Sequence, residues 1–495
     1  MTIKYKSTRG NAESIGSAQA ILQGLAGDKG LYVPVDFPTL DVKLSEIAEM
    51  DYKEVAFYIL KKYLEDYTEQ ELKDAIEKAY DEKFETSEIA PLAKEKDVYF
   101  LELYHGKTLA FKDMALSILP HLLTTAAKKM GENKKIVILA ATSGDTGKAA
   151  LEGFADVENT EVIIFYPEKG VSEIQKRQMT TQEGKNTHTI AIKGNFDDAQ
   201  RGVKEIFNDG AFNREMNESN HIFSSANSIN IGRLVPQVVY YVYTYGQLLK
   251  RGEIKEGETI NFVVPTGNFG NILAGYYAKK MGLPINKLIC ASNENNVLYD
   301  FINSGIYDIN RKFIITNSPS MDILISSNLE RLLYELSEGD EGLINRIMGQ
   351  LETENKYEIT PKMKENLKGF YGGYTTDEQT LETIKRVYNE SKYVMDTHTA
   401  VAYKVYEQYK EETKDTSKTV IVSTASPYKF TKSVIGALSE TNEGKDEFEL
   451  IKVLSEHTGL QIPTPIKDLD KKEILHRTVC EKQDMKATIK EMLHI

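Results

Sequence analysis

The stretch YHGKTLAFKDMA, Tyr104 to Ala115, decides the fold of this 495-residue chain. It follows VYFLEL (Val98 to Leu103), which is typical of a buried strand, and it opens the apolar helical run AFKDMALSILPHLLTTAA. Lys112 stands just after the turn, among apolar neighbours such as Phe111 and Met114. Apolar surroundings lower the pKa of a lysine, and a neutral lysine can hold an aldehyde as a Schiff base. The residues alone leave two interpretations open, a solvated lysine on a helix face or this reactive one.

The same stretch resembles the cofactor-lysine segment of the threonine synthase family, which are pyridoxal-phosphate enzymes of the tryptophan-synthase β fold type. The family pattern is aromatic-His-Gly-Pro-Thr, then an apolar pair, then Phe-Lys-Asp. The matching residues here are Tyr104, His105, Gly106, Thr108, Phe111, Lys112 and Asp113. Lys107 stands where the family has proline, which loosens the turn because proline fixes φ.

Composition argues against several classes of partner. Lys and Arg number 61 against 74 Asp and Glu, so the net charge of −13 disfavours nucleic acid and anionic membranes. An anionic substrate would therefore need a local basic pocket. The two cysteines, Cys290 and Cys480, form no disulfide framework and suit a reducing cytosol. The first residues lack the apolar core of a signal peptide, and no run approaches the roughly 20 apolar residues of a membrane helix. We predict a cytoplasmic protein, as a monomer or homodimer.

The length gives a soft prior of about three domains, and the pattern of elements divides the chain into three parts. Residues 1–90 contain helical patterns and are predicted to be an N-terminal helical domain that packs on the core. Residues 91–440 alternate strand and helix, which predicts an α/β core with a mostly parallel sheet. Within them, about 306–418 is more helical and shows few strand signals. Residues 441–495 are charged and are predicted to be a C-terminal helical tail. The resemblance implies fold type II, in which the core has two parallel-sheet lobes.

Three apolar runs mark strands of this core with particular clarity. They are KKIVILAA (Lys134 to Ala141), INFVVP (Ile260 to Pro265) and TVIVSTA (Thr419 to Ala425). Each is followed by a polar or glycine-rich turn. Ligands of such sheets bind at the carboxyl ends of the strands, so these turns are the candidate sites.

Two glycine-rich turns lead from a strand into a helix and could bind anions. TGNFGN (Thr266 to Asn271) offers backbone N–H groups at a helix N-terminus, although a tight structural turn explains it equally well. TSGDTGKAA (Thr142 to Ala150) superficially resembles a nucleotide P-loop, but Ala149 follows Lys148 where that motif needs Ser or Thr. The resemblance implies that the first turn holds the cofactor phosphate and the second holds the substrate carboxylate.

Two further segments gather polar groups. SANSINIGR (Ser225 to Arg233) combines amides, hydroxyls and an arginine fork around a helix start, which suits a phosphate dianion or plain N-capping with a surface arginine. The resemblance assigns it to the substrate phosphate, and we expect Lys107 and Lys148 to assist. VSTASPYKF (Val422 to Phe430) follows a strand, and the resemblance places Thr424 at the pyridine nitrogen of the cofactor. Ser426 stands where the family has histidine.

The resemblance implies threonine synthase activity, in which O-phospho-L-homoserine and water give L-threonine and phosphate. Lys112 would be both the cofactor anchor and the catalytic general base, and no metal is expected. The implied cofactor-binding residues are Lys112, Gly267, Asn268, Phe269, Gly270, Asn271 and Thr424. The implied substrate-binding residues are Ser143, Asp145, Thr146, Asn227, Ser228, Asn230 and Arg233. Two alternatives remain, another fold-type-II lyase such as a threonine dehydratase, and a non-catalytic paralogue that binds a phosphorylated amino acid.

Overall fold

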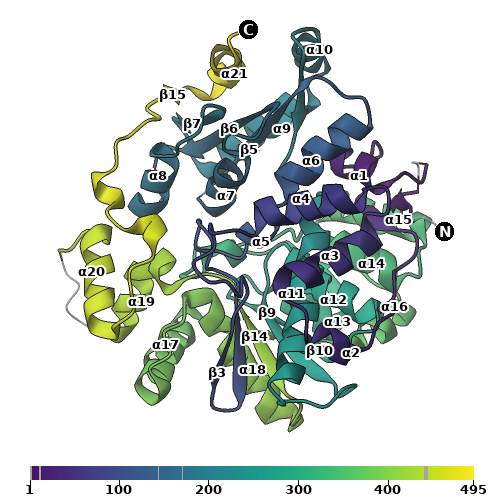
Figure 1. Ribbon diagram of the computed structural model, residues 1–495, viewed down its shortest axis with the longest axis vertical. Coiled ribbons are helices and arrows are strands. Elements are labelled where there is room, and N and C mark those ends of the chain that lie inside the picture. Colours follow the sequence, from purple (N-terminus) through teal and green to yellow (C-terminus); the bar gives the residue numbers. More distant parts are fainter. Residues whose placement is uncertain (1–2, 11–12, 143, 170, 440–443) are drawn as a thin grey trace.

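A computed structural model describes residues 3–10, 13–142, 144–169, 171–439 and 444–495. Two β-sheets form two lobes, with the smaller sheet at the top of Figure 1 and the larger one at the bottom. The predicted α/β core with two parallel-sheet lobes is therefore present. In the described part of the chain, no helix is both long enough and apolar enough to cross a bilayer.

The larger sheet has six strands, and all its pairs are parallel except the edge pair β3–β4. Its order is β13 (Phe370–Tyr374), β10 (Ile285–Ser292), β9 (Ile260–Pro265), β14 (Thr419–Ser423), β4 (Val98–Glu102) and β3 (Leu92–Glu95). The central strand β9 is buried along its whole length, as a continuous apolar run predicts for a strand covered on both faces. The segments that follow β4, β9 and β14 carry the candidate cofactor residues.

The smaller sheet has five strands, and all of its pairs are parallel. Its order is β15 (Val479–Cys480), β7 (Thr187–Ile192), β6 (Thr160–Pro167), β5 (Lys135–Ala141) and β8 (His221–Ser224). The TSGDTG turn follows β5, and SANSINIGR follows β8. Both candidate substrate segments thus leave the carboxyl end of a strand of this lobe.

Strands in three regions were not predicted from the sequence. Residues 306–418 contain β11 (Ile306–Asp308), β12 (Lys356–Glu358) and the sheet-edge strand β13. In β13 the sequence FYGGY has two consecutive glycines, which weaken the strand signal. The C-terminal tail likewise adds the two-residue strand β15 to the smaller sheet. A further pair near the N-terminus, β1 (Tyr5–Ser7) with β2 (Tyr32–Pro34), is antiparallel.

Helices cover both sheets, and the long helix α11 (Ile231–Lys250) runs buried through the centre. Helices α3 (Tyr52–Tyr63) and α4 (Glu69–Ala79) begin at capping boxes, and α3 packs on α11. The other helices of the N-terminal region and of the smaller lobe are α1 (Ser17–Gln23), α2 (Leu44–Ile47), α5 (Asp113–Leu116), α6 (Leu119–Lys129), α7 (Asp145–Phe154), α8 (Glu173–Thr180), α9 (Phe196–Asn208) and α10 (Gly210–Glu218). The remaining helices are α12 (Gly270–Lys280), α13 (Val297–Ser304), α14 (Leu329–Leu336), α15 (Glu341–Glu354), α16 (Pro361–Asn366), α17 (Asp377–Ser391), α18 (Thr397–Thr413), α19 (Thr431–Leu438), α20 (Glu447–Thr458) and α21 (Met485–Leu493).

The C-terminal segment touches both lobes. Helix α20 packs on α19 beside the larger sheet, whereas β15 joins the edge of the smaller sheet. Figure 1 shows this segment, in yellow, crossing from one lobe to the other. The division of the chain at residues 90 and 440 remains a prediction.

The contact between α5 and α7 gives a test of the packing beside the candidate lysine. A Cβ added to Gly153 of α7 would lie 2.2 Å from the carbonyl oxygen of Leu116, a backbone atom that cannot swing away. We expect Gly153→Ala to lower the free energy of unfolding by about 2 kcal/mol. Gly349→Ala in α15 is the matched control, because a Cβ there meets nothing within 4 Å. It should raise stability by about 0.5 kcal/mol through lower unfolded-state entropy. Urea unfolding of both variants checks this, and equal effects would contradict the close packing.

Candidate active site

Lys112 is a largely enclosed amine at the N-cap of α5, between the lobes. Its side chain is 13% exposed, and its Nζ lies 3.4 Å from Oδ2 of Asp145. Burial lowers the pKa of Lys112, and the nearby charges of Lys429 and Arg233 lower it further, while Asp145 opposes them. Of the two interpretations drawn from sequence, the structure therefore favours the desolvated amine over the solvated one.

The turn before Lys112 is held by Asp113. Its carboxylate accepts hydrogen bonds from the Thr108 N–H at 2.8 Å and the Thr108 hydroxyl at 2.6 Å. A Cβ at Gly106 would lie 2.5 Å from this carboxylate, which explains why glycine stands there. Burial raises the pKa of Asp113 to about 6. The segment HGKTLAFKD thus keeps a tight turn without the family's proline, since side-chain bonds fix it.

The TGNFGN turn leads from β9 into α12 and offers free donors. Gly267 and Asn268 accept through their carbonyls from the Ser326 hydroxyl and the Asn328 N–H, at 2.7 and 3.1 Å. Within the described residues, the N–H groups of Gly267, Asn268 and Phe269 meet no protein acceptor. They precede the N-terminus of α12, where the helix dipole favours an anion.

The glycines and Asn271 complete this cradle. A Cβ at Gly267 would lie 2.8 Å from the Ser320 carbonyl oxygen. Phe269 has φ 62°, in the left-handed region. Gly270 starts α12, and the amide oxygen of Asn271 accepts from the Tyr240 and Tyr241 hydroxyls at 2.8 and 2.7 Å. The Asn271 Nδ2 is buried without a partner. An unpaired buried donor beside free backbone N–H groups fits a phosphate at this turn.

The TSGDTG turn places Asp145 and Thr146 in the first turn of α7. The Thr142 hydroxyl accepts from the Gly144 and Gly147 N–H groups at 2.9 and 3.0 Å and so fixes the turn. Thr146 is half-buried. Ser143, the first predicted substrate residue of this turn, lies outside the described residues. The structure brings Asp145 to Lys112 directly.

The SANSINIGR segment splits into two groups. Arg233 is 3% exposed, donates to the Ala226 carbonyl at 2.6 Å and keeps a buried Nε without a partner. Burial lowers its pKa to about 10. Asn230 instead caps α11, because its amide accepts from the Gly232 N–H and donates to the Ile21 carbonyl. Asn227 is exposed and accepts from the Ser228 hydroxyl at 3.3 Å. The charge of Arg233 is one of those that lower the pKa of Lys112.

Thr424 follows β14 next to the Lys112 turn. Its carbonyl accepts from the Phe111 N–H at 2.8 Å, and the neighbouring Ala425 forms an isolated bridge with Ala110. Ser426, in place of the family's histidine, caps the short 3₁₀ helix η3 (Pro427–Phe430) through its hydroxyl. Thr424 is therefore within the site, and Ser426 has a local structural task.

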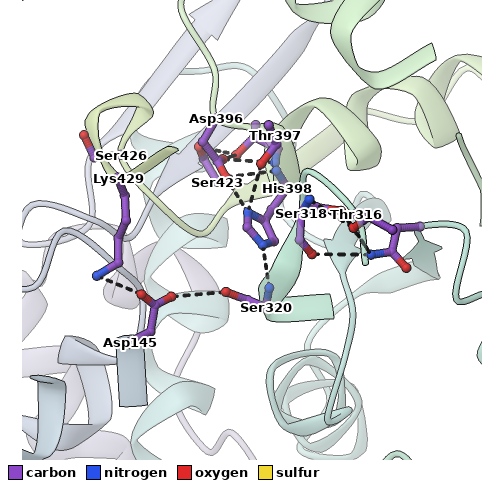
Figure 2. Close-up of polar contacts among 12 residues, drawn as sticks. Asp145, Thr316, Ser318, Ser320, Asp396, Thr397, His398, Ser423, Ser426 and Lys429 are labelled. Atoms are coloured by element: carbon purple, nitrogen blue, oxygen red, sulfur yellow. Dashed lines mark hydrogen bonds and ion pairs between the residues drawn. The ribbon is translucent and has the colours of Figure 1, made fainter. Parts of the chain in front are cut away.

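Four residues around Asp145 were missed by the sequence argument. The Asp145 carboxylate contacts Nζ of Lys429 at 3.1 Å, Nε2 of Gln175 at 2.8 Å and the Ser320 hydroxyl at 3.1 Å. The Ser320 N–H donates to Nε2 of His398 at 3.1 Å (Figure 2). Lys429 stands in the quoted stretch VSTASPYKF, so its place after a strand-end turn was a usable signal. The other three carried none.

His398 reaches the site only through Ser320. Its Nδ1 lies 2.7 Å from Asp396 Oδ2, and its Nε2 accepts the hydrogen bond from the Ser320 N–H. Asp396 in turn accepts from the Thr399 hydroxyl, which contacts the Ser423 hydroxyl at 2.9 Å. A chain of polar contacts, buried up to His398 and exposed at Ser320, thus links the end of β14 to Asp145 (Figure 2).

Lys107 and Lys148 lie in a neighbouring cleft of about 1250 Å³ between α6 and α7. Both face Glu152, with Nζ–carboxylate distances of 3.8 Å for Lys107 and 2.5 Å for Lys148. Lys148 also donates to the Gln182 side chain. Both lysines are therefore paired with Glu152. Within the described chain, no group of His, Cys, Asp and Glu could hold a metal ion.

The assembled residues fit pyridoxal phosphate. A desolvated amine suits its aldehyde, and the TGNFGN donors suit its phosphate. Lys429 and Arg233 outnumber Asp145 even with Lys112 neutral, so the site is the basic pocket that an anionic substrate needs in an acidic protein.

Comparisons with known proteins agree with this geometry. Residues 4–80 match the family model "Threonine synthase N terminus", 84–425 match "Pyridoxal-phosphate dependent enzyme", and 399–489 match "Threonine synthase, C-terminal". The last match covers residues 441–489 of the C-terminal tail.

Relatives cover most of the chain. Threonine synthase of Saccharomyces cerevisiae is 39% identical over 88% of this chain and 89% of its own length. That of Pseudomonas aeruginosa is 39% identical over 87% and 90%. Human threonine synthase-like 1 is 40% identical, and the chain spans 58% of its length.

Solved structures agree as well. The yeast threonine synthase structure has a TM-score of 0.89 at 36% identity, and the pyridoxal-phosphate-bound enzyme from Brucella melitensis has 0.88 at 35%, each covering 99% of both chains. The family resemblance inferred from the cofactor-lysine segment is confirmed. The chain belongs to the threonine synthase family of pyridoxal-phosphate-dependent enzymes.

Proposed function

We propose that this protein is a threonine synthase, which converts O-phospho-L-homoserine and water to L-threonine and phosphate. The supporting observation is one buried amine, Lys112, flanked by two anion-binding turns and a buried arginine with an unused donor. Such a site can bind a cofactor phosphate, a carboxylate and a second phosphate at the same time. The family membership supports the same reaction.

Lys112 has the central role in this proposal. Its amine anchors the cofactor and, once released by the substrate amine, serves as the general base at Cα and then at Cβ. Burial lowers the pKa of Lys112, and the charges of Lys429 and Arg233 lower it further against the opposing effect of Asp145, which favours the uncharged form that a base needs. The bound cofactor supplies an electron sink for the carbanion that this proton removal leaves.

The other predicted residues bind and orient. Gly267, Asn268, Phe269, Gly270 and Asn271 would hold the cofactor phosphate, and Thr424 would interact with the pyridine ring. The turn with Ser143, Asp145 and Thr146 receives the α-carboxylate. Arg233, with Asn227 and Ser228, binds the phosphate that leaves from Cγ, while Asn230 shapes that segment by capping α11.

The test is incubation of the purified holoenzyme with O-phosphohomoserine, with phosphate and threonine measured together. Equal amounts of both products support the proposal. Ammonia and 2-oxobutyrate from L-threonine as main products would favour a threonine dehydratase. Cofactor bound without any turnover would favour the non-catalytic paralogue.

We propose a cytoplasmic location and a monomer or homodimer that acts on this small molecule, with neither nucleic acid nor membrane as partner. Cys290 and Cys480 are both free and buried, which suits a reducing compartment. The net charge of −13 argues against polyanionic partners.

A further inference from the structure

Lys429 is a buried cation without a role in the reaction described above. It lies in η3, just after the strand that ends near Thr424, and its side chain is 2% exposed. Its Nζ donates to the Thr108 carbonyl at 2.5 Å and lies 3.1 Å from Oδ1 of Asp145. Burying an ammonium costs desolvation free energy, which suggests that these contacts serve a purpose beyond stability.

These two contacts join three separate segments. Thr108 belongs to the turn that presents Lys112, Asp145 begins α7 of the smaller lobe, and Lys429 itself follows β14 of the larger sheet. Ser320 adds a second bond from the larger lobe to the same carboxylate. Figure 2 shows Asp145 between Lys429 and Ser320. Asp145 is thus fixed from the opposite lobe on both of its oxygens.

The charge of Asp145 poses an electrostatic problem. Its turn is the proposed seat of the substrate carboxylate, and a carboxylate there repels an anion unless its charge is cancelled. Burial alone would raise the pKa of Asp145, but Lys429 first and Lys112 second hold it well below its usual range. Lys112 cannot remain that partner when it works as an uncharged base. Lys429 lies 3.1 Å from the other oxygen of this carboxylate and does not act as a base in the proposed reaction.

The surrounding charges leave this assignment intact. The charge of Arg233 lowers the pKa of Lys112, and the charge of Lys429 lowers the pKa of Asp113. The charge of Lys429 also lowers the pKa of Lys148, which forms an ion pair with Glu152. Within the described residues, Asp145 is the sole carboxylate in ion-pair range of either Lys112 or Lys429.

We propose that Lys429 is a positioning residue that cancels and fixes the charge of Asp145, so that the turn beside Lys112 accepts an anionic amino acid. This inference rests on the proposed function of the turn as a carboxylate site. It assigns Lys429 to substrate acceptance and to the protonation of Lys112, through Asp145, without contact with the reacting atoms.

The test uses the holoenzymes of K429M, K429R, D145N and the double variant K429M/D145N, with the visible absorbance of the bound cofactor titrated against pH. K429M removes a positive charge near Lys112 and leaves Asp145, so the midpoint should move to higher pH. D145N should move it to lower pH. The double variant removes one charge of each sign and should return toward wild type, as should K429R. A purely structural role would give K429M and the double variant the same midpoint, which would overturn the proposal.

Substrate kinetics supply the second readout. K429M should raise KM for O-phosphohomoserine at least about tenfold, and the double variant should recover part of this loss. If K429M does not accumulate as folded protein, D145N decides: an unmoved midpoint overturns the proposal. Absence of turnover in the wild type would refute the proposed function while leaving the titration interpretable. Normal turnover with unmoved midpoints would refute only the role of Lys429.

Discussion

Lys112→Ala is expected to remove the visible absorbance of the bound cofactor and to lower turnover at least about 10³-fold, because one amine serves as anchor and base. Lys112 Nζ is buried beside Asp145, and the TGNFGN turn is separate from it. The variant should therefore still bind the cofactor phosphate, with the aldehyde unlinked. Absorbance spectra of the purified protein, before and after added pyridoxal phosphate, measure this.

Lys368→Ala is the matched control for that change. Its side chain is 71% exposed and pairs only with Glu365, so spectrum and turnover should match the wild type. Borohydride reduction of the wild type followed by peptide mapping should place the pyridoxyl group between Phe111 and Asp113. Retained absorbance in Lys112→Ala, or a tag in another peptide, would exclude Lys112 as the anchor.

Arg233→Ala is expected to raise KM for the phosphorylated substrate about 100-fold while cofactor absorbance stays unchanged. One terminal nitrogen of the Arg233 guanidinium donates to the Ala226 carbonyl, and its Nε is buried without a hydrogen-bond partner. A phosphate dianion would satisfy that donor. Steady-state kinetics with O-phosphohomoserine and titration with pyridoxal phosphate separate the two effects.

Arg331→Met provides the contrast, because Arg331 is buried but has no free fork. It donates to the Tyr32 and Ile229 carbonyls and to the Asn328 side chain. Its loss should lower the free energy of unfolding by about 2–3 kcal/mol, since buried acceptors lose their partners. Were Arg233→Ala to weaken cofactor and substrate equally, Arg233 would be structural, like Arg331.

Much of the fold could be predicted from local patterns. Strand β9 was predicted with its observed ends, because a parallel strand covered on both faces needs a continuous apolar run. The turns after β5 and β9 were identifiable as candidate anion sites because such sites favour glycine close to a helix start. By contrast, strand β13 was not predicted because its two glycines weaken the strand pattern, and its pairing with β10 is not visible in the local sequence.

The partners of Asp145 could not be predicted in the same way. Ser320, Gln175 and His398 lie 175, 30 and 253 residues from Asp145 along the chain, and no local pattern marks any of them. Asn230 was noticed in the sequence, but its role could not be decided there. Its residue type suits both capping and phosphate binding, and only its bonds to Gly232 and Ile21 reveal the first use. The roles of the predicted site residues themselves remain predictions.

The C-terminal segment has a consequence for how the two lobes come apart. One end of it is packed beside the larger sheet through α20, and the other is hydrogen-bonded into the smaller sheet through β15. Any opening wide enough to separate the sheets must therefore break the β15–β7 ladder or strip α20 from α19. The C-terminal segment allows small motions of the lobes that admit a substrate. It does not allow either lobe to unfold independently of the other. Calorimetry should accordingly record a single cooperative heat-absorption peak for the intact chain.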